Sequence, residues 1–178
     1  MNKRLFDIVI SLIALAVFSP ILIVLPILIW LEDRENPFFV QTRLGQKLKP
    51  FSIIKFRSMH MDQITSIGRI IRNTGLDEIL QFIIVLKGEM SVVGPRPLTK
   101  ADTLRLGWYD SSTLRSQAKP GITGLSQLYA GRSKRVSYFL DNKYALNQSF
   151  VLDIKIIALS FAVNILGKKR VKSFMRRA

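Results

Sequence analysis

The longest hydrophobic stretch of the sequence lies at its start. Residues 8–31 contain no charged side chain, whereas both flanks are charged: Lys3, Arg4 and Asp7 before the stretch, and Glu32, Asp33 and Arg34 after it. About 20 apolar residues are enough to cross a bilayer, so this pattern predicts a membrane segment. A cleaved signal peptide fits poorly, because the stretch is too long and no small-residue cleavage site follows it.

Ser19 and Pro20 interrupt this segment near its centre. Proline lacks a backbone donor and clashes with the preceding turn, so it kinks a helix. Basic residues favour the cytoplasmic side and here lie on both flanks, which favours a hairpin that enters and leaves the same leaflet. A kinked helix that crosses the membrane once fits the residues equally well, because irregular backbone in lipid needs protein or water as a partner.

Shorter patterns follow the membrane segment. Residues 38–59 contain two β-rich stretches separated by turn residues, which predict a small β-hairpin. Residues 64–73 place isoleucines on one face and arginines on another, as in a short amphipathic helix. A second helix is expected to begin near Thr74 and to end before Gly88.

The second half of the chain is less regular. Residues 89–99 and 117–133 are rich in Gly and Pro and are expected to form loops, whereas residues 102–114 are compatible with a helix. Residues 150–166 are apolar again and precede a basic tail. Three polar side chains make this segment a poor second span: Asp153, Lys155 and Asn164. The pattern favours a helix lying in the membrane interface, and a helix packed in the core with a solvated tail is the alternative.

These elements predict an α+β fold that is predominantly helical. Residues 1–34 would form the membrane anchor, and residues 35–178 one compact domain that includes the interfacial helix and basic tail. The whole chain has 178 residues, which is too short for two full-sized domains.

The charge balance narrows the class of protein. The chain has 27 Lys and Arg against 12 Asp and Glu, a formal charge of +15, yet its mean hydropathy is positive. A soluble nucleic-acid binder would show the charge without the hydropathy, whereas a protein on an anionic membrane surface shows both. The absence of cysteine excludes thiolate catalysis and sulfur-based zinc sites, and a single histidine, His60, argues against Ser-His catalysis.

Asp77 and Glu78 are the most informative pair of acidic residues. With Thr74 as the expected N-cap, both carboxylates would lie in the first turn of the second helix. The exposed N–H groups and the helix dipole there lower the pKa of a carboxylate and attract phosphate. An ionised Asp beside a phosphate is what aspartyl-phosphate chemistry requires. A capping box from Thr74 to Asp77 that only stabilises the helix is the alternative, and the pair alone favours it.

Basic residues and glycine-rich turns lie on both sides of this pair. Arg96 is held between Pro95 and Pro97, which fix the backbone and suit a guanidinium directed at an anion, although a rigid turn carrying a solvated Arg is equally consistent. The KPGITG turn at 119–124 and the Gly-Arg pair at 131–132 are able to bind a diphosphate through backbone N–H groups, a weak signal without a strand-helix frame.

Together these segments resemble the monotopic phosphoglycosyl transferases, which form the bacterial sugar transferase family. The resemblance covers nearly the whole chain, and its ordered set of motifs is specific although each motif alone is not. The motifs are the Ser19-Pro20 break, KFRSM (55–59), LDEILQF (76–82), VLKGEMSVVGPRP (85–97), KPGITGLSQL (119–128), GR (131–132) and SFVLDIKI (149–156).

The resemblance implies a two-step transfer. Asp77 would attack the β-phosphate of a UDP-sugar, release UMP and carry a covalent phosphosugar, which undecaprenyl phosphate would then accept as the first membrane step of surface polysaccharide synthesis. Asp77 and Glu78 would hold Mg²⁺, with Glu78 alternatively assisting proton transfer. The Ser19-Pro20 break would make the anchor re-entrant in the bacterial inner membrane, with the catalytic domain on the cytoplasmic face.

Motif position also implies substrate contacts at Lys55, Arg57, Arg72, Arg96, Gly121, Thr123, Gly124 and Arg132. Two positions depart from the family pattern: Leu80 stands where Pro is usual, and Ile84 where Asn is usual. The expected partners are a UDP-sugar, a polyprenyl phosphate and anionic lipid, and no nucleic acid. The sequence identifies neither the sugar nor the oligomeric state, so a homodimer stays open.

Two other functions compete with this interpretation. The first is a membrane-tethered basic domain that binds nucleic acid or anionic lipid without catalysis, because Lys and Arg neutralise phosphates. The chain lacks the aromatic platform and the recognition motifs of nucleic-acid binders. The second is a multi-pass sugar-phosphate transferase. The sequence has one strongly apolar segment, which is too few for a protein that crosses the membrane several times.

Overall fold

The computed structural model describes residues 2–128 and 133–166. Its first element is a bent pair of helices, α1 (Lys3–Val17) and α2 (Ser19–Asp33), whose axes differ by 59°. No single helix within the described ranges is long and apolar enough to cross a membrane, but this pair meets both criteria together. Pro20 lies in the first turn of α2, where its missing N–H costs no hydrogen bond, so the predicted break is present as the start of a new helix.

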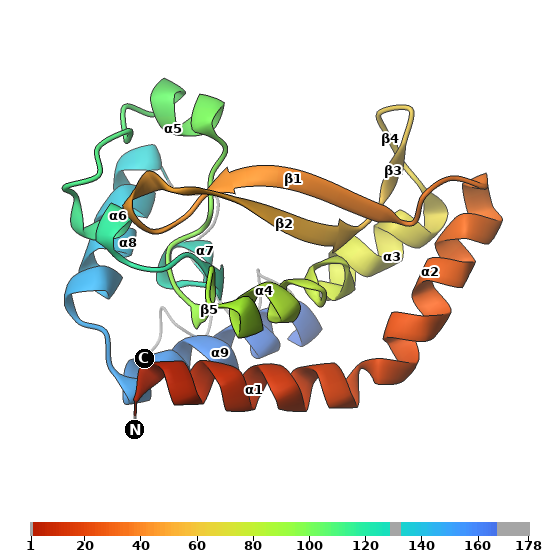
Figure 1. The fold of residues 1–178 in the computed structure, drawn as a ribbon, viewed down its shortest axis with the longest axis horizontal. Coiled ribbons are helices and arrows are strands. Elements are labelled where there is room, and N and C mark those ends of the chain that lie inside the picture. Colours follow the sequence, from red (N-terminus) through yellow and green to blue (C-terminus); the bar gives the residue numbers. More distant parts are fainter. Residues whose placement is uncertain (1, 129–132, 167–178) are drawn as a thin grey trace.

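The predicted β-hairpin is confirmed. β1 (Phe38–Leu44) pairs antiparallel with β2 (Pro50–Phe56), and a short 3-10 turn, η1 (Gln46–Leu48), joins them. Figure 1 shows this hairpin on the side of the molecule opposite α1. Arg43 pairs with Phe51, and side chains alternate along a strand, so Arg43 and Lys55 lie on the same face as the buried Phe51 and Ile53. Two cations therefore point from the hairpin toward the body of the protein.

The prediction that a helix begins near Thr74 is wrong. Thr74 is the last residue of α3 (Ser66–Thr74), and its hydroxyl donates back to the carbonyl of Ile70 at 2.9 Å. Gly75 ends α3 with a φ of 76°, which glycine adopts without strain. Asp77 and Glu78 then fall in a 3-10 turn, η2 (Leu76–Glu78), before α4 (Gln81–Lys87). The proposed capping box is therefore absent.

Two segments expected to be loops contain a pair of parallel strands. β5 (Ser91–Val93) pairs with β6 (Gly121–Thr123). Glycines permit this approach, since a Cβ at Gly94 would lie 2.3 Å from the Lys119 carbonyl oxygen and one at Gly121 would lie 2.0 Å from the Gly94 nitrogen. At these positions glycine is needed for close backbone packing.

The remaining elements are mostly short helices. They are β3 (Met59–His60), β4 (Gln63–Ile64), α5 (Lys100–Arg105), α6 (Leu114–Gln117), α7 (Leu125–Leu128), α8 (Lys134–Leu146) and α9 (Phe150–Leu166). The helix considered for 102–114 is limited to α5 and α6, and α8 was not predicted. The described residues are mostly helical with three separate two-stranded sheets, in keeping with the predicted α+β class.

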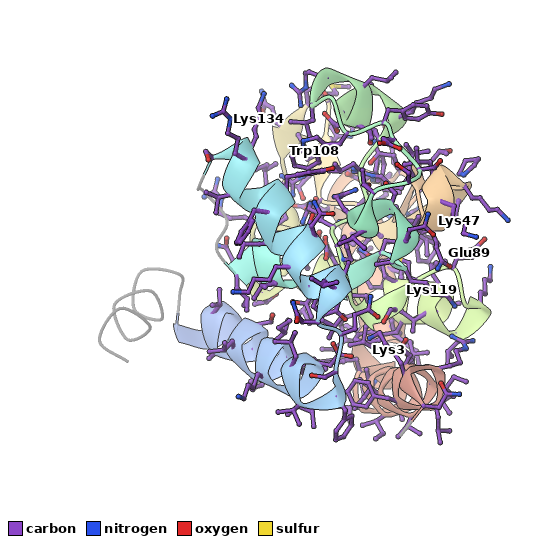
Figure 2. The ribbon with its side chains drawn as sticks, turned by 90° about the vertical axis from the view of Figure 1, so that its left-hand side faces the viewer. Lys3, Lys47, Glu89, Trp108, Lys119 and Lys134 are labelled. Atoms are coloured by element: carbon purple, nitrogen blue, oxygen red, sulfur yellow. The ribbon has the colours of Figure 1, made fainter. Side chains whose placement is uncertain are left out.

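Helix α9 lies beside α1, as both Figures 1 and 2 show. The Nζ atom of Lys3 donates to Asp153 at 2.6 Å, and the rings of Phe6 and Phe150 pack edge to face. One side of α9 is buried in the core, including Asp153 and Ile156, whereas Ile154 and other apolar side chains on its opposite side are exposed. Features of both sequence interpretations are therefore present: a core-packed face and an apolar surface.

Candidate active site

Asp77 and Glu78 lie at the junction of α3 and α4, under the β-hairpin. Both side chains are partly exposed, and Glu78 forms an ion pair with Lys55 of β2. Burial and the adjacent Glu78 raise the pKa of Asp77, whereas Lys55 and Arg72 oppose this rise. The prediction that a helix N-terminus lowers the pKa of Asp77 is wrong. In this short turn, burial raises the pKa of Asp77 more than the nearby positive charges lower it.

A cleft of about 1120 Å³ extends from this pair. Its polar wall contains Asp77 and Glu78, together with Arg72 from α3, Arg96 from the loop after β5 and Thr123 from β6. The sequence analysis predicted all five as site residues, with Asp77 and Glu78 as the acidic pair and the other three as substrate contacts. This part of the cleft thus combines the carboxylates of Asp77 and Glu78 with the guanidinium groups of Arg72 and Arg96, an arrangement suited to a phosphate substrate.

A second group of cations adjoins the cleft. Arg43, Lys55, Glu78 and Arg96 line a small hollow beside it. Burial and the nearby Arg96 lower the pKa of Arg43, as expected for cations gathered at one point. The sequence analysis missed Arg43 as a site residue. The signal was its strand position, because a basic side chain on the inner face of an amphipathic hairpin is unusual unless it meets an anion.

The Pro95–Pro97 turn is fixed by hydrogen bonds from two directions. The Gly121 N–H donates to the Pro95 carbonyl at 2.9 Å, and a guanidinium N–H of Arg115 donates to the Arg96 carbonyl at 2.6 Å. Both prolines are buried and Arg96 is exposed at the cleft. The sequence left two interpretations of this turn: a rigid turn, or a guanidinium presented to an anion. The structure has a rigid turn, and the Arg96 side chain at its centre lines the cleft.

Arg115 and Asp141 form a buried ion pair that also lines the cleft. The Nε of Arg115 donates to Oδ2 of Asp141 at 3.0 Å, and its guanidinium lies over the Trp108 ring. Figure 2 shows Trp108 beside α8, near Lys134 at the start of that helix. Burial raises the pKa of Asp141, and Arg115 opposes this rise. The sequence analysis singled out none of these residues, and no local motif marks them.

Three of the predicted contacts are placed elsewhere, and the structure does not describe a fourth. Arg57 forms ion pairs with Asp33 and Glu35 at the end of α2 and does not line the cleft. Gly121 and Gly124 contribute close backbone packing against Gly94 instead of lining the cleft. Arg132 lies outside the described residues. A substrate-binding role for these four residues stays a prediction.

The side of the cleft formed by α1 and α9 is mostly apolar. Ile10 of α1 and Phe18 at the helix break line it, together with Ile157, Phe161 and Val163 of α9. The same cleft therefore joins a charged, phosphate-compatible end to side chains of the bent helix pair.

Carboxylate groups for a metal are few. Within residues 2–128 and 133–166 no three Asp, Glu, His or Cys side chains come together as a metal cluster. Mg²⁺ is usually bound through one or two carboxylates plus substrate phosphates, so Asp77 and Glu78 fit an ion that arrives with a diphosphate.

Comparisons with known proteins agree with the sequence motifs. The profile of a family described as bacterial sugar transferase matches residues 1–167. A UDP-glucose:undecaprenyl-phosphate glucose-1-phosphate transferase of Klebsiella pneumoniae is 35% identical over 190 residues, which cover 93% of this chain and 40% of that protein. The uncharacterized sugar transferase EpsL of Bacillus subtilis (strain 168) is 37% identical over 172 residues, covering 89% of this chain and 84% of EpsL.

A third relative is the exopolysaccharide production protein PSS of Rhizobium leguminosarum bv. phaseoli. It is 37% identical over 183 residues, which cover 87% of this chain and 90% of that protein. The chain therefore spans less than half of the Klebsiella protein but most of the Bacillus and Rhizobium proteins.

Proposed function

Because the chain belongs to the bacterial sugar transferase family, we propose that it is a phosphoglycosyl transferase that moves a sugar phosphate from a UDP-sugar to undecaprenyl phosphate. The named activity of the Klebsiella relative supports both the donor and the acceptor class. The single structural observation that carries the proposal is the cleft itself, which is lined by Asp77, by the cationic side chains of Arg72 and Arg96 and by apolar side chains of α1 and α9.

In the first step, a carboxylate oxygen of Asp77 attacks the β-phosphorus of the UDP-sugar. The bond from this phosphorus to the bridging oxygen breaks, and UMP leaves with that oxygen and its electron pair. Arg72 and Arg96 line the cleft and are placed to neutralise charge on the phosphate oxygens. Asp77 must be ionised for this attack, and Lys55 and Arg72 favour its ionised form.

In the second step, a phosphate oxygen of undecaprenyl phosphate attacks the same phosphorus. The bond to the Asp77 carboxylate breaks, which restores the free carboxylate and gives a polyprenyl diphosphate sugar. Mg²⁺ held by Asp77 or Glu78 together with the substrate diphosphate would supply further neutralisation of phosphate charge.

A re-entrant anchor in the bacterial inner membrane is the second part of the proposal. At the start of α1, the Arg4 guanidinium donates to the carbonyls of Val85 and Leu86 at 2.5 and 2.6 Å. At the end of α2, Glu32 accepts a hydrogen bond from the Ser66 N–H at 2.8 Å. Because both ends of the pair are bonded to one folded unit, a hairpin with that unit on the cytoplasmic face is favoured over a span.

The covalent intermediate provides the test. Membranes containing the protein are incubated with a UDP-sugar and no acceptor, and UMP release and the phosphosugar adduct are measured by mass spectrometry. The wild-type protein should release one UMP per adduct, Asp77→Asn should form neither, and Asp110→Asn, outside the cleft, should behave as wild type. If Asp77→Asn still forms the adduct, or if UMP appears only when acceptor is present, the two-step mechanism is wrong.

A further inference from the structure

The apolar side of the cleft, formed by α1 and α9, has no role in the first step of the proposed reaction. We infer that it is the binding site for the first isoprene units of the acceptor, which would lie between α1 and α9 with the acceptor phosphate directed at Asp77. This inference rests on the proposed function and extends it, because it locates the lipid chain within the protein.

The two walls of this subsite come from opposite ends of the sequence. Ile10 and Phe18 line it from the bent helix pair, and Ile157 and Phe161 line it from α9. The Lys3–Asp153 bond and the packing of Phe6 on Phe150 hold these helices together near the start of α1. An apolar channel between two joined helices suits a long hydrocarbon chain, because burying its surface is favourable and requires no hydrogen bonds.

The subsite also opens onto the apolar surface of the protein. Phe161 lines the cleft and is still 66% exposed. Val17 at the end of α1, next to the cleft-lining Phe18, is also an exposed apolar side chain. An isoprenoid chain can therefore pass from the lipid into the cleft without crossing a polar surface.

The charged side of the cleft restricts which ligand can fill it. Arg72 and Arg96 line the same cleft, so a ligand that fills it carries an anionic head as well as an apolar chain. Its volume of about 1120 Å³ exceeds the ~300–1,000 Å³ usual for one small ligand, which leaves room for a lipid chain beside the phosphosugar. A polyprenyl phosphate meets both requirements, whereas a nucleotide sugar has no long apolar chain.

Matched serine substitutions test the inference. Ile10→Ser and Ile157→Ser alter the cleft, and Ile13→Ser and Ile154→Ser alter exposed positions of the same two helices that do not line it. Each protein is first loaded with phosphosugar, and its transfer to undecaprenyl phosphate is then measured against acceptor concentration and divided by the amount of adduct. The cleft variants should raise the acceptor KM about 10-fold, the effect expected for one lost apolar side-chain contact. The surface variants should leave the acceptor KM within about 2-fold of wild type.

A crosslinking experiment covers the case in which a serine variant does not fold. The wild-type protein is irradiated with a polyprenyl phosphate that carries a photoreactive group in its first isoprene unit, and the labelled peptides are sequenced. Labels at Ile10, Phe18, Ile157 or Phe161 support the subsite. Labels confined to exposed positions such as Ile13 and Ile154, or equal KM changes in all four variants, overturn it. A failure to form adduct in the wild-type protein would instead reject the proposed function before this test begins.

Discussion

Asp77 is set between opposing influences on its ionisation. Burial and Glu78 raise its pKa, whereas Lys55 and Arg72 lower it. Only the ionised carboxylate attacks phosphorus, so adduct formation should fall as the pH drops through the pKa of Asp77. Lys55→Met removes a favourable charge and leaves Glu78 without its ion-pair partner. We therefore expect the acid limb of the pH profile for adduct formation to move to higher pH.

The measurement is the rate of acceptor-free UMP release from pH 4 to 9. Glu78→Gln should shift the acid limb in the opposite direction, because it removes the negative charge that raises the pKa of Asp77. Lys49→Met, on the exposed hairpin turn, should not shift it. If the acid limb lies at the same pH in the wild-type protein and in all three variants, a group other than Asp77 controls the reaction at low pH.

At this scale the sequence predicted residue identities better than it predicted their surroundings. Asp77, Glu78, Arg72 and Arg96 were assigned from motifs, and the structure places them in one cleft. The pKa direction of Asp77 was wrong, because a helix cap is a local inference whereas desolvation depends on distant packing. Arg115 could not be found locally, since the partners that define it come from two other parts of the chain.

Among the elements, the turn that carries Arg96 depends most on a single buried contact. Arg115 is 8% exposed and bonds both Asp141 and the Arg96 carbonyl. Removing one partner of a buried ion pair leaves an uncompensated charge, which costs about 3–5 kcal/mol. Arg115→Met should therefore lower the free energy of unfolding by about 3 kcal/mol and raise the KM for the UDP-sugar. Urea denaturation in detergent measures the first effect.

A matched arginine provides the control for this prediction. Arg105 pairs with Asp102 on the surface, where the two side chains are 71% and 36% exposed. Exposed pairs contribute less than about 1 kcal/mol, so Arg105→Met should change stability little. Similar losses from Arg115→Met and Arg105→Met would contradict the role given to the buried pair.

Helix α1 is also bonded to the strand that leads into the Arg96 turn. Oδ1 of Asp7 accepts hydrogen bonds from the Ser91 hydroxyl at 2.9 Å and from the Val92 N–H at 3.1 Å. Asp7→Ala leaves these buried donors without a partner, at a cost of about 1–3 kcal/mol. We expect a lower Tm and a higher donor KM with unchanged recovery in the membrane fraction. Asp7→Asn retains an acceptor oxygen and should restore much of both, and a loss from the membrane would show that Asp7 acts in anchoring instead.

Elements defined by local periodicity were predictable, and those defined by distant partners were not. The hairpin of β1 and β2 and helix α9 follow from alternation and apolar content along one segment. The parallel pairing of β5 with β6 joins residues 91–93 to residues 121–123, and its glycines resemble a turn when viewed along the chain alone. Thr74 was assigned to the wrong helix because a Thr after an amphipathic run is able to cap the next helix or end the present one.

At the scale of the whole molecule, the sequence left the path of the anchor open between a span and a hairpin. Helix α1 has 15 residues, a length of roughly 22 Å, and is too short to cross a hydrocarbon core of about 30 Å by itself. The 59° bend and the hydrogen bonds at both ends of the pair favour a hairpin. In Figure 1 the rest of the described chain lies on one side of α1 and in the angle that it makes with α2.

The absence of native cysteine makes this topology directly measurable, since a single introduced thiol has no background. Asn2→Cys and Glu35→Cys place thiols just outside the two ends of the helix pair. If the anchor is re-entrant, a membrane-impermeant maleimide should label both positions only in inverted vesicles or lysed cells, because both ends face the cytoplasm. A straightened anchor should change this result: Pro20→Ala restores a backbone donor at the break and permits one continuous helix long enough to span. In that variant one of the two thiols should become reactive in intact spheroplasts, and such labelling in the protein without Pro20→Ala would exclude the hairpin.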